Sequence, residues 1–503
     1  MSGPLLDPRT APAFPKAAHN LLRDQQLRKN LHHATSVIQD KRARVVSELH
    51  DWEQLRLAGQ RIREHTMAHL DAYLEQFEQN CTRAGGVVHW ARNAEEARQI
   101  VVRLATEAIK ENLQTSPEIL KIKSMTTEEI GLNGALEAAG IHPYETDLAE
   151  LIIQLGHDKP SHIVVPALHK NRQQIHEIFR REMNLPELGS SPEDLADAAR
   201  LFLREKFLRV PTAISGANFL IAETGGVCIV ESEGNGRMCL TLPRTLITVA
   251  GIDKVIPRFR DLEVFLQLLP RSATGERMNP YNSIWTGIYE NDGPRSFHVV
   301  LMDNARTSVL ADQEGRQTLN CIRCGACQNI CPVYRETGGH AYGSVYAGPI
   351  GAILTPQLQQ MEHARSLPYA SSLCGACYEV CPVRINIPEI LVHLRHRVVQ
   401  HDSKGLGALR PEPIAMKAMS RIFQSESRFR AAQRLARNAD RPLARKDKTG
   451  KAWIHWLPGM LGGWTQSRDL QALPDQTFRE WWEQRNRAAQ RKVDSSAGGT
   501  NAG

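Results

Sequence analysis

The sequence predicts an α/β domain, followed by a mainly helical, cysteine-rich domain and a helical C-terminal region. With 503 residues, the chain exceeds the roughly 250 to 300 residues at which a single core stops growing, so we expect several folded units. Short β-branched runs alternate with amphipathic stretches between residues 87 and 303, as in layered α/β domains. Seven of the ten cysteines then fall between Cys321 and Cys381, which indicates a site in a separate segment.

The composition is that of a globular protein. It is 42% hydrophobic and 23% charged, which excludes a wholly disordered or collagen-like chain. No apolar run reaches the roughly 18 to 20 residues of a membrane-spanning helix, and residues 1–16 contain no apolar signal segment. We therefore expect a cytoplasmic protein, in which reduced cysteines bind metal or carry redox chemistry.

The first segment, residues 1–66, is predicted to form a helical layer. Charged residues are interleaved with apolar ones from Ala17 onward, and no proline or glycine occurs between Ala17 and Gly59. We place the α/β domain at residues 67–305. Four of its strands are predicted from β-branched runs at 162–166, 227–230, 246–249 and 298–302.

One helix of the α/β domain has a clear predicted start at Ser191. The Ser191 hydroxyl is suited to cap the helix, and Pro192 occupies a position where a missing N–H costs nothing. Glu193 and Asp194 complement the helix dipole. Apolar residues from Leu195 onward share one face, so we expect an amphipathic helix.

The glycine-rich segment 222–237 matches neither G-x-G-x-x-G nor the P-loop pattern, so it predicts no nucleotide site. We interpret it as a tight hairpin, the alternative being an anion pocket of backbone N–H groups near Glu223, Asn235 and Arg237. Other polar residues of the domain are candidates whose convergence the sequence does not establish: Lys121, Ser124, Glu128, Glu129, Ser161, His162 and His169.

The net charge of +7 is concentrated near the C-terminus. Twelve basic and four acidic side chains lie between Arg410 and Lys451, in a region that we assign to a basic, tryptophan-rich domain at 401–485. Such a stretch contacts nucleic acid, an anionic membrane surface or an acidic partner, or is simply a solvated helix face. The small, polar residues at the end of the chain predict a disordered tail over 486–503.

The first cysteine motif predicts a cubane iron–sulfur site. Cys321, Cys324, Cys327 and Cys331, followed by Pro332, form the run C-x₂-C-x₂-C-x₃-C-P that bacterial-type ferredoxins use. Zinc is the alternative, but zinc usually takes paired C-x₂₋₄-C units and leaves the third cysteine without a role. A c-type haem is excluded locally because no C-x-x-C-H occurs. We assign no metal to the two cysteines near predicted strands, Cys228 and Cys239.

The second motif repeats the first with Ser371 in the leading position, followed by Cys374, Cys377 and Cys381. In two-cluster ferredoxins the last cysteine of each motif binds the other cluster. If this crossed pattern holds, one [4Fe–4S] cluster is held by Cys321, Cys324, Cys327 and Cys381, and the second by Cys331, Cys374 and Cys377.

The second predicted cluster therefore lacks one protein thiolate. Its fourth iron takes the Ser371 oxygen, water, a substrate oxygen or a partner's side chain, or else the site holds a [3Fe–4S] cluster. An open iron acts as a Lewis acid, whereas a three-iron centre is only an electron relay. We favour a relay cluster beside which a serine is tolerated.

These features together resemble the lactate utilization protein B family over nearly the whole chain. Besides both cysteine motifs, the resemblance is carried by the segments 121–129, 145–148, 154–155, 160–163, 166–170, 223–226, 463–469 and 478–482. The resemblance implies an α/β domain related in fold to sugar-phosphate isomerases and CoA transferases, with a two-cluster ferredoxin domain at 306–400. It also implies that a three-cysteine second motif is the family's own pattern.

The resemblance further implies a part in oxidising L-lactate to pyruvate, with two partner proteins. One partner is rich in cysteine motifs and the other carries a related α/β domain. We expect no nucleic acid partner, and a peripheral contact with the inner membrane face through the basic region is compatible with the charge. No flavin or nicotinamide fingerprint occurs, so the first electron acceptor is expected in another subunit.

Three interpretations remain open at this stage. The preferred one is an iron–sulfur electron-transfer subunit of a lactate-oxidising complex. The second is an enzyme whose α/β domain binds a small carboxylate with participation of the open cluster, and the third is a scaffold whose clusters are structural. The sequence assigns no catalytic residue.

Overall fold

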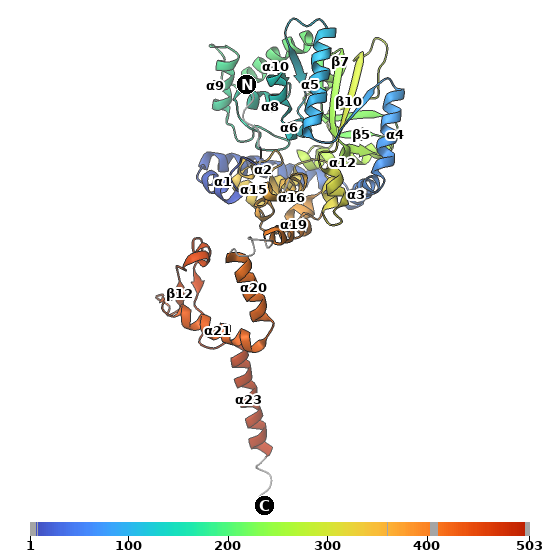
Figure 1. Ribbon diagram of the computed structural model, residues 1–503. Helices are drawn as coiled ribbons and strands as arrows, with labels where there is room; N and C mark the ends of the chain where they lie inside the picture. Colours follow the sequence, from blue (N-terminus) through green and yellow to red (C-terminus); the bar gives the residue numbers. More distant parts are fainter. Residues whose placement is uncertain (1–6, 8, 360, 403–410, 498–503) are drawn as a thin grey trace, which may run out of the picture. The chain divides into compact units, whose positions relative to one another are not determined.

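The computed structural model describes residues 7, 9–359, 361–402 and 411–497, and the chain forms two compact units, Met1–Val398 and Val399–Gly503 (Figure 1). The predicted segments 1–66, 67–305 and 306–400 lie in the first unit, except for residues 399 and 400, which belong to the second.

Four helices begin the first unit: α1 (Phe14–Leu21), α2 (Gln25–Ser47), α3 (Trp52–Ala68) and α4 (Leu70–Arg83). The carboxylate of Asp24 caps α2 by accepting from the N–H of Leu27. Helices α2 and α3 contact both the α/β domain and the cysteine-rich segment. The predicted N-terminal layer therefore joins the two domains.

The α/β domain is built on a six-stranded, all-parallel sheet. In spatial order its strands are β1 (Val87–Ala91), β10 (Ser296–Met302), β7 (Thr245–Gly251), β4 (Thr212–Ser215), β2 (Glu118–Lys121) and β3 (His142–Glu145). A four-stranded mixed sheet follows the order β8 (Val255–Ile256), β5 (Phe219–Ile221), β6 (Gly226–Glu231) and β9 (Tyr281–Trp285).

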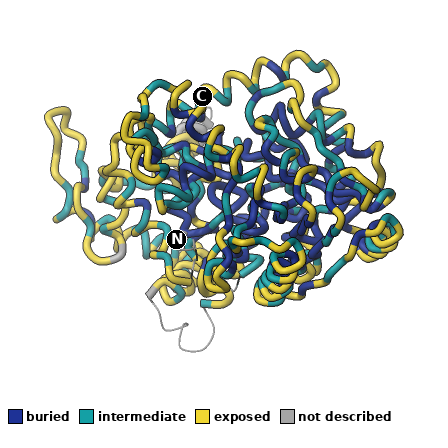
Figure 2. The backbone as a smooth tube through the Cα atoms, turned by 90° about the horizontal axis from the view of Figure 1, so that it is seen from above, coloured by how far each residue is buried: buried dark blue, intermediate teal, exposed yellow. Residues whose placement is uncertain are grey.

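Both faces of the six-stranded sheet are buried, as expected of a parallel sheet. Along β10, Phe297, Val299 and Leu301 join a core with α4 and the second sheet, whereas Val300 and Met302 join a core with α5. These side chains of β10 are buried, and Figure 2 draws buried residues in dark blue. The flanking helices are α5 (Ala94–Glu111), α6 (Met125–Glu129), α7 (Leu132–Ala138), α8 (Leu148–Leu155), α9 (Arg172–Glu182), α10 (Pro192–Arg209), α11 (Asn235–Thr241), α12 (Leu262–Ala273) and α13 (Arg306–Ala311).

Three of the four predicted strands are confirmed by β6, β7 and β10, but the strand predicted at 162–166 is wrong. This segment is a loop closed by Ser161 N–H donating to the Pro166 carbonyl at 3.0 Å. Its polar groups bind the cysteine-rich segment, since the N–H of Ile163 donates to Gln328 Oε1. Tertiary contacts therefore override the β-branched pattern.

The predicted helix start at Ser191 is confirmed by α10. The Ser191 hydroxyl accepts from the N–H of Asp194 at 3.1 Å, and the Asp194 carboxylate accepts from the N–H of Ser191, which completes a capping box. Replacing Ser191 by alanine should lower the free energy of unfolding by about 1 kcal/mol. Urea denaturation checks this value, and an unchanged midpoint would contradict the role of the cap.

The two cysteine motifs fold alike. Each places a non-glycine residue and then a glycine at positive φ, Arg323 (61°) and Gly325 (74°) in the first motif and Leu373 (54°) and Gly375 (85°) in the second. Short helices follow both glycines. The helices of this segment are α14 (Ala326–Ile330), α15 (Pro332–Thr337), α16 (Gly348–Leu358), α17 (Met361–Ala364), α18 (Ala376–Val380) and α19 (Ile387–Asp402).

The second unit contains α20 (Pro411–Phe423), α21 (Glu426–Asp440), α22 (Gly462–Thr465), α23 (Phe478–Ala497) and a small sheet of β11 (Arg445–Lys446), β12 (Ala452–Ile454) and β13 (Leu470–Gln471). The prediction of a disordered tail from residue 486 is wrong up to Ala497, because the pattern of good helix formers continues α23. Residues 498–503 lie outside the described residues. Among the described helices, none is long and apolar enough to cross a membrane.

Candidate metal centre

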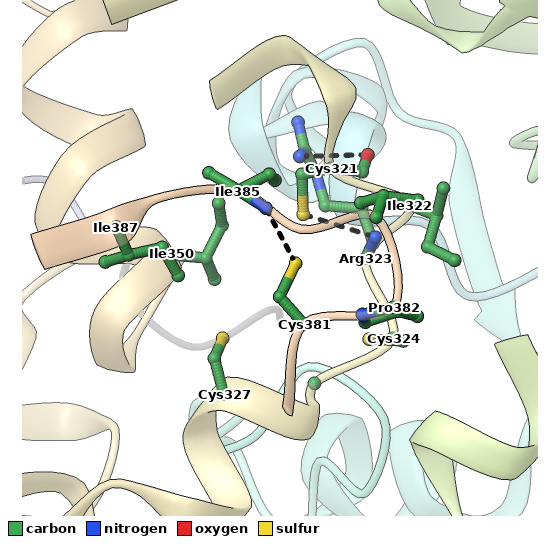
Figure 3. Close-up of a pocket in the computed structure, with 12 residues that line it drawn as sticks. Cys321, Ile322, Arg323, Cys324, Cys327, Ile350, Cys381, Pro382, Ile385 and Ile387 are labelled. Atoms are coloured by element: carbon green, nitrogen blue, oxygen red, sulfur yellow. Dashed lines mark hydrogen bonds between the residues drawn. The ribbon is translucent and has the colours of Figure 1, made fainter. Parts of the chain in front are cut away.

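Four cysteines from both motifs line one pocket of the first unit. They are Cys321, Cys324 and Cys327 of the first motif and Cys381 of the second. Figure 3 shows the side chains of Cys321, Cys327 and Cys381 turned toward one another. The structure thus brings together the set that the crossed pattern assigns to one cluster.

Apart from Arg323, the other residues that line this pocket are apolar or glycine, and backbone N–H groups donate to two of its sulfur atoms. Ile350, Ile385 and Ile387 are among its lining residues. The N–H of Ile385 donates to Cys381 Sγ at 3.3 Å and the N–H of Arg323 donates to Cys321 Sγ at 3.4 Å (Figure 3). Such N–H···S bonds stabilise thiolates that bind a metal cluster.

Burial raises the pKa of these thiols. The pKa of Cys381 rises to about 11, mainly through desolvation, and burial also raises the pKa of Cys324 and Cys327. At neutral pH these groups are protonated unless a cation holds them as thiolates, so metal binding here releases protons.

Three buried or half-buried cations surround the same pocket without an acidic partner. Arg42 donates to the Val380 carbonyl, next to Cys381, and Arg63 donates to the carbonyls of Val255, Asp253 and Leu319. The third cation is Lys254, and none of the three forms an ion pair in the part of the chain that the structure describes.

Burial is the main influence on these cations. It lowers the pKa of Arg63 to about 10 and that of Lys254 to about 8, although the nearby carboxylate of Asp253 acts in the opposite direction on both. Within the described residues, the Nε atoms of Arg42 and Arg63 are buried without a hydrogen-bond partner. An anionic group held by four thiolates would add negative charge beside these cations, so these residues fit a cubane cluster.

Arg323, inside the first motif, connects this pocket to the α/β domain. Its guanidinium lies 3.3 Å from Asp253 Oδ2 and stacks over Tyr346 at 5.1 Å. Asp253 in turn binds Arg306 Nε at 2.5 Å, and Arg306 makes a bidentate pair with Glu129. Asp253 and Arg306 follow β7 and β10, so the network lies at the carboxyl edge of the parallel sheet.

The second cysteine set, Cys331, Cys374 and Cys377, is more exposed to solvent than the first. Cys331 and Cys377 are buried, whereas Cys374 is exposed to solvent. Burial raises the pKa of Cys377 to about 12, and Cys331 and Cys374 raise it further. Ser371, where the fourth cysteine would stand, is half-buried, and its hydroxyl accepts from the N–H of Leu373 at 3.1 Å.

An orphaned polar atom also lies near the second set. The hydroxyl of Tyr342 is buried and has no hydrogen-bond partner among the described residues. Its pKa is raised by burial and then by nearby Cys331. A free hydroxyl beside three thiols fits a sulfide-bearing group, to which it can donate.

Several predicted candidates of the α/β domain do converge, at the carboxyl ends of β2 and β3. Lys121 is fully buried and lies 2.6 Å from Glu145 Oε1 and 3.1 Å from Glu128 Oε1. Close by, Lys123 lies 3.9 Å from the buried Glu150. Sheet order reverses between β2 and β4, which is where α/β sheets bind ligands.

The remaining candidates have structural roles in this chain. Ser124 caps α6, and Glu129 pairs with Arg306. His162 is buried and contacts Asn329 Oδ1 at 3.1 Å, and burial lowers its pKa to about 3, so its ring is neutral. His169 contacts Asp158 Oδ2 at 3.0 Å.

Asp158, His169 and His340 place potential ligand atoms within 4.8 Å of one another. The carboxylate also pairs with Lys170, and the N–H of Lys159 donates to it. This polar cluster is therefore satisfied by protein groups.

The glycine-rich segment is a hairpin between β5 and β6 whose second half starts α11, which confirms the predicted hairpin for its first half. The N–H groups of Gly236 and Arg237 both donate to the Glu231 carboxylate at 2.6 Å. An internal side chain thus occupies the position where an anion pocket was considered. Cys228 and Cys239 are buried, as expected.

Glu150 gives the unfolding free energy a pH dependence. Burial raises its pKa well above the ordinary 4.5. The folded state therefore holds a proton that the unfolded state releases, and stability falls as pH rises from about 4.5 through the raised value. Replacing Glu150 by glutamine should remove this loss, about 1.4 kcal/mol for each unit of pKa difference.

Urea unfolding at pH 5.5 and pH 8.0 measures this effect. The matched control is Glu111→Gln, since Glu111 is exposed and should leave the pH dependence of the parent chain intact. If the unfolding free energy changed equally between the two pH values in Glu150→Gln and in the parent, the raised pKa of Glu150 would be contradicted.

Sequence reasoning missed the basic groups of the first pocket. Arg42, Arg56 and Arg63 belong to α2 and α3, helices that the sequence predicts only as a layer. Their contacts with the cysteine-rich segment span hundreds of residues, as in the bond from Arg56 Nε to the Cys381 carbonyl at 3.0 Å. For Arg323 the sequence did offer a signal, because this residue stands between Cys321 and Cys324, two predicted cluster ligands.

Comparison with known proteins assigns each part of the chain. Residues 74–302 match the LUD domain, residues 317–385 the 4Fe–4S dicluster domain, and residues 393–487 the C-terminal domain of lactate utilisation protein B. A DUF162 family protein from Deinococcus radiodurans covers 46% of this chain and 98% of its own at 15% identity, with a TM-score of 0.23, which is too low to establish a shared fold.

Similar proteins match over nearly the full length. Lactate utilization protein B of Geobacillus kaustophilus (strain HTA426) is 43% identical over 451 residues, 89% of this chain and 91% of the relative. That of Bacillus subtilis (strain 168) is 41% identical over 486 residues, 96% of this chain and 98% of the relative. The protein is an iron–sulfur, metal-binding protein of lactate utilization, and the chain belongs to the lactate utilization protein B family.

Proposed function

We propose that this protein is the iron–sulfur electron-transfer component of a multi-subunit complex that oxidises L-lactate to pyruvate. The observation that carries the proposal is the pocket where Cys321, Cys324, Cys327 and Cys381 meet, with the buried guanidinium groups of Arg42 and Arg63 nearby. When bound, a cubane cluster takes up and releases one electron at a time. Two such sites form a relay for the electrons that lactate releases.

The proposed ligands of the second cluster are Cys331, Cys374 and Cys377. Its fourth position is taken by the Ser371 oxygen, water or a partner's group, or the cluster is of the [3Fe–4S] type. The exposure of Cys374 supports electron exchange with another protein at this edge. The chain's own residues bind the clusters, donate N–H groups to the thiolates and exclude water from the first site.

The proposal includes two other lactate-utilization proteins as partners, one rich in cysteine motifs and one with a related α/β domain. A cytoplasmic position, peripheral to the membrane through the basic C-terminal region, agrees with the basic helices α20 and α21. The parallel sheet with helices on both faces supports a relation to sugar-phosphate isomerases and CoA transferases.

A second candidate function is a small-carboxylate-binding enzyme. It is favoured by the buried Glu145 and Glu150 at the reversal point of the sheet, because Glu145 Oε2 and Glu150 Oε1 lack hydrogen-bond partners among the described residues and are suited to accept from the hydroxyl of a small hydroxy carboxylate. This candidate requires lactate to bind the isolated chain.

Anaerobic EPR and Mössbauer spectroscopy of the purified chain separates the two functions. The relay predicts two clusters that L-lactate reduces only when the partner proteins are present. Reduction by lactate alone would move the active site into this chain, and absence of iron and sulfide would overturn both functions.

A further inference from the structure

The second unit exposes many of its large apolar side chains. Among those of its residues whose burial the structure describes, Ile454 is the one buried hydrophobic residue. The exposed apolar residues of its helices and loops include Ile414, Met419, Phe423, Leu435, Trp456, Trp464, Phe478, Trp481 and Trp482. A unit with so small a core is stabilised when another surface covers such groups.

One face of α23 carries aromatic residues that contact one another. Phe478, Trp481 and Trp482 lie three and four residues apart, and their ring centroids are 5.6 to 6.1 Å from one another. These residues are 72%, 42% and 47% exposed. Arg485 continues the face, with its guanidinium 5.4 Å from the ring centroid of Trp481 and 6.0 Å from that of Trp482. We call these four residues the aromatic stripe.

The opposite face of α23 is held within the unit. Glu480 pairs with Arg437 at 3.1 Å, and Glu483 pairs with Arg430, both cations belonging to α21 (Figure 1). Since successive residues of a helix are rotated by about 100°, Glu480 and Glu483 lie on the side of α23 away from the aromatic stripe. The stripe is therefore turned away from α21.

The charge of the second unit indicates an anionic partner. Residues 399–503 contain 19 basic and 10 acidic side chains, a net charge of +9, whereas residues 1–398 contain 43 basic and 45 acidic side chains, a net charge of −2. A second copy of the unit would repel it. A nucleic acid is disfavoured because its bases stack on free ring faces, and Arg485 lies over both indoles of the stripe.

Indole rings beside guanidinium groups are suited to the surface of a bilayer. Tryptophan lies at the level of the lipid headgroups, because its ring is apolar and its N–H is polar. Arginine places its aliphatic stem along apolar groups and its charge at a phosphate. The same pairing occurs at Trp464, which is 53% exposed and has the Arg468 guanidinium 4.8 Å from its ring centroid. An aromatic face on a basic helix is typical of helices that lie in the plane of a membrane surface.

We propose that the aromatic stripe of α23 binds the surface of an anionic bilayer, with its three rings among the headgroups and Arg485 at a lipid phosphate. This inference rests on the proposed function, and it names the segment through which the protein takes its peripheral position. None of the proposed cluster ligands belongs to the second unit. Bilayer binding and cluster binding are therefore lost separately.

The experiment is flotation of the anaerobic, full-length holoprotein with vesicles. Vesicles of phosphatidylcholine with about one quarter phosphatidylglycerol should bind the parent chain about tenfold more tightly than vesicles of phosphatidylcholine alone, because the anionic lipid attracts basic side chains. Trp482→Ala should weaken binding to the anionic vesicles about tenfold, since less apolar area leaves water. Arg485→Glu should weaken it at least as much, whereas Arg485→Lys keeps the charge and should bind like the parent.

The matched control is Trp90→Ala, because Trp90 is 46% exposed but lies in β1 of the first unit, so its loss should leave flotation unchanged. EPR of every variant checks that the clusters are retained. Equal binding of Trp482→Ala and the parent, or equal binding to both vesicle types, would overturn the inference. Failure of the parent to float with its cluster signals intact would also overturn it and leave an acidic protein as the occupant. Absence of cluster signals would instead overturn the proposed function.

Discussion

Replacing Cys381 by serine is expected to remove one cluster and about half of the bound iron and sulfide, although the residue belongs to the motif that supplies the other cluster. The reason is the pocket in which Cys381 stands with Cys321, Cys324 and Cys327. Crossed ligation makes the spectrum remaining in Cys381→Ser match that of Cys324→Ser. Cys331→Ser should instead share its remaining spectrum with Cys377→Ser.

Iron analysis and EPR of the reduced variants measure this pairing. Cys228→Ala is the control, since this buried cysteine lies in β6, away from both motifs, and its replacement should leave the iron content unchanged. If Cys331→Ser matched Cys324→Ser, each motif would serve its own cluster and the crossed assignment would be wrong.

The first iron–sulfur motif could be recognised from sequence because three of the proposed ligands of one cube, Cys321, Cys324 and Cys327, lie within a few residues of one another. The parallel sheet was predictable for a similar reason, since β7 and β10 are nearly continuous runs of apolar residues. The loop at 162–166 was not, because the N–H of Ile163 binds Gln328 and the ring of His162 contacts Asn329, and no local pattern reports such contacts.

The charges around the first pocket lie beyond local reasoning as well. Arg63 and Lys254 stand far apart in sequence, and each looks like a surface residue until the fold buries it. Only a three-dimensional arrangement shows that Arg63 binds backbone carbonyls instead of a carboxylate. The same holds for Lys121, whose partner Glu145 ends the neighbouring strand.

Replacing Arg306 by methionine is expected to cost about 3 to 5 kcal/mol of the free energy of unfolding, because it leaves the buried Glu129 without its counter-charge and Asp253 with only the longer contact to Arg323. The Arg306 side chain is 1% exposed and binds both Asp253 and Glu129. Although burial favours the neutral acid, Arg306 and Arg323 hold the pKa of Asp253 below its usual range. The stability that this pair contributes is therefore present at neutral pH and is lost as pH falls.

Urea unfolding at pH 7 and pH 3 tests this expectation, because the loss begins only below the ordinary carboxyl pKa values of 3.8 and 4.5. Arg306→Lys keeps the charge but loses the bidentate geometry, so its loss should be smaller. Arg92→Met removes an exposed guanidinium that pairs with Glu96 and should change little. If Arg306→Met were as stable as the parent, the network of Asp253, Arg306 and Glu129 would not stabilise the contact between the α/β domain and the cysteine-rich segment. Another interaction would then have to fix Arg323 and the loop of Cys321 and Cys324.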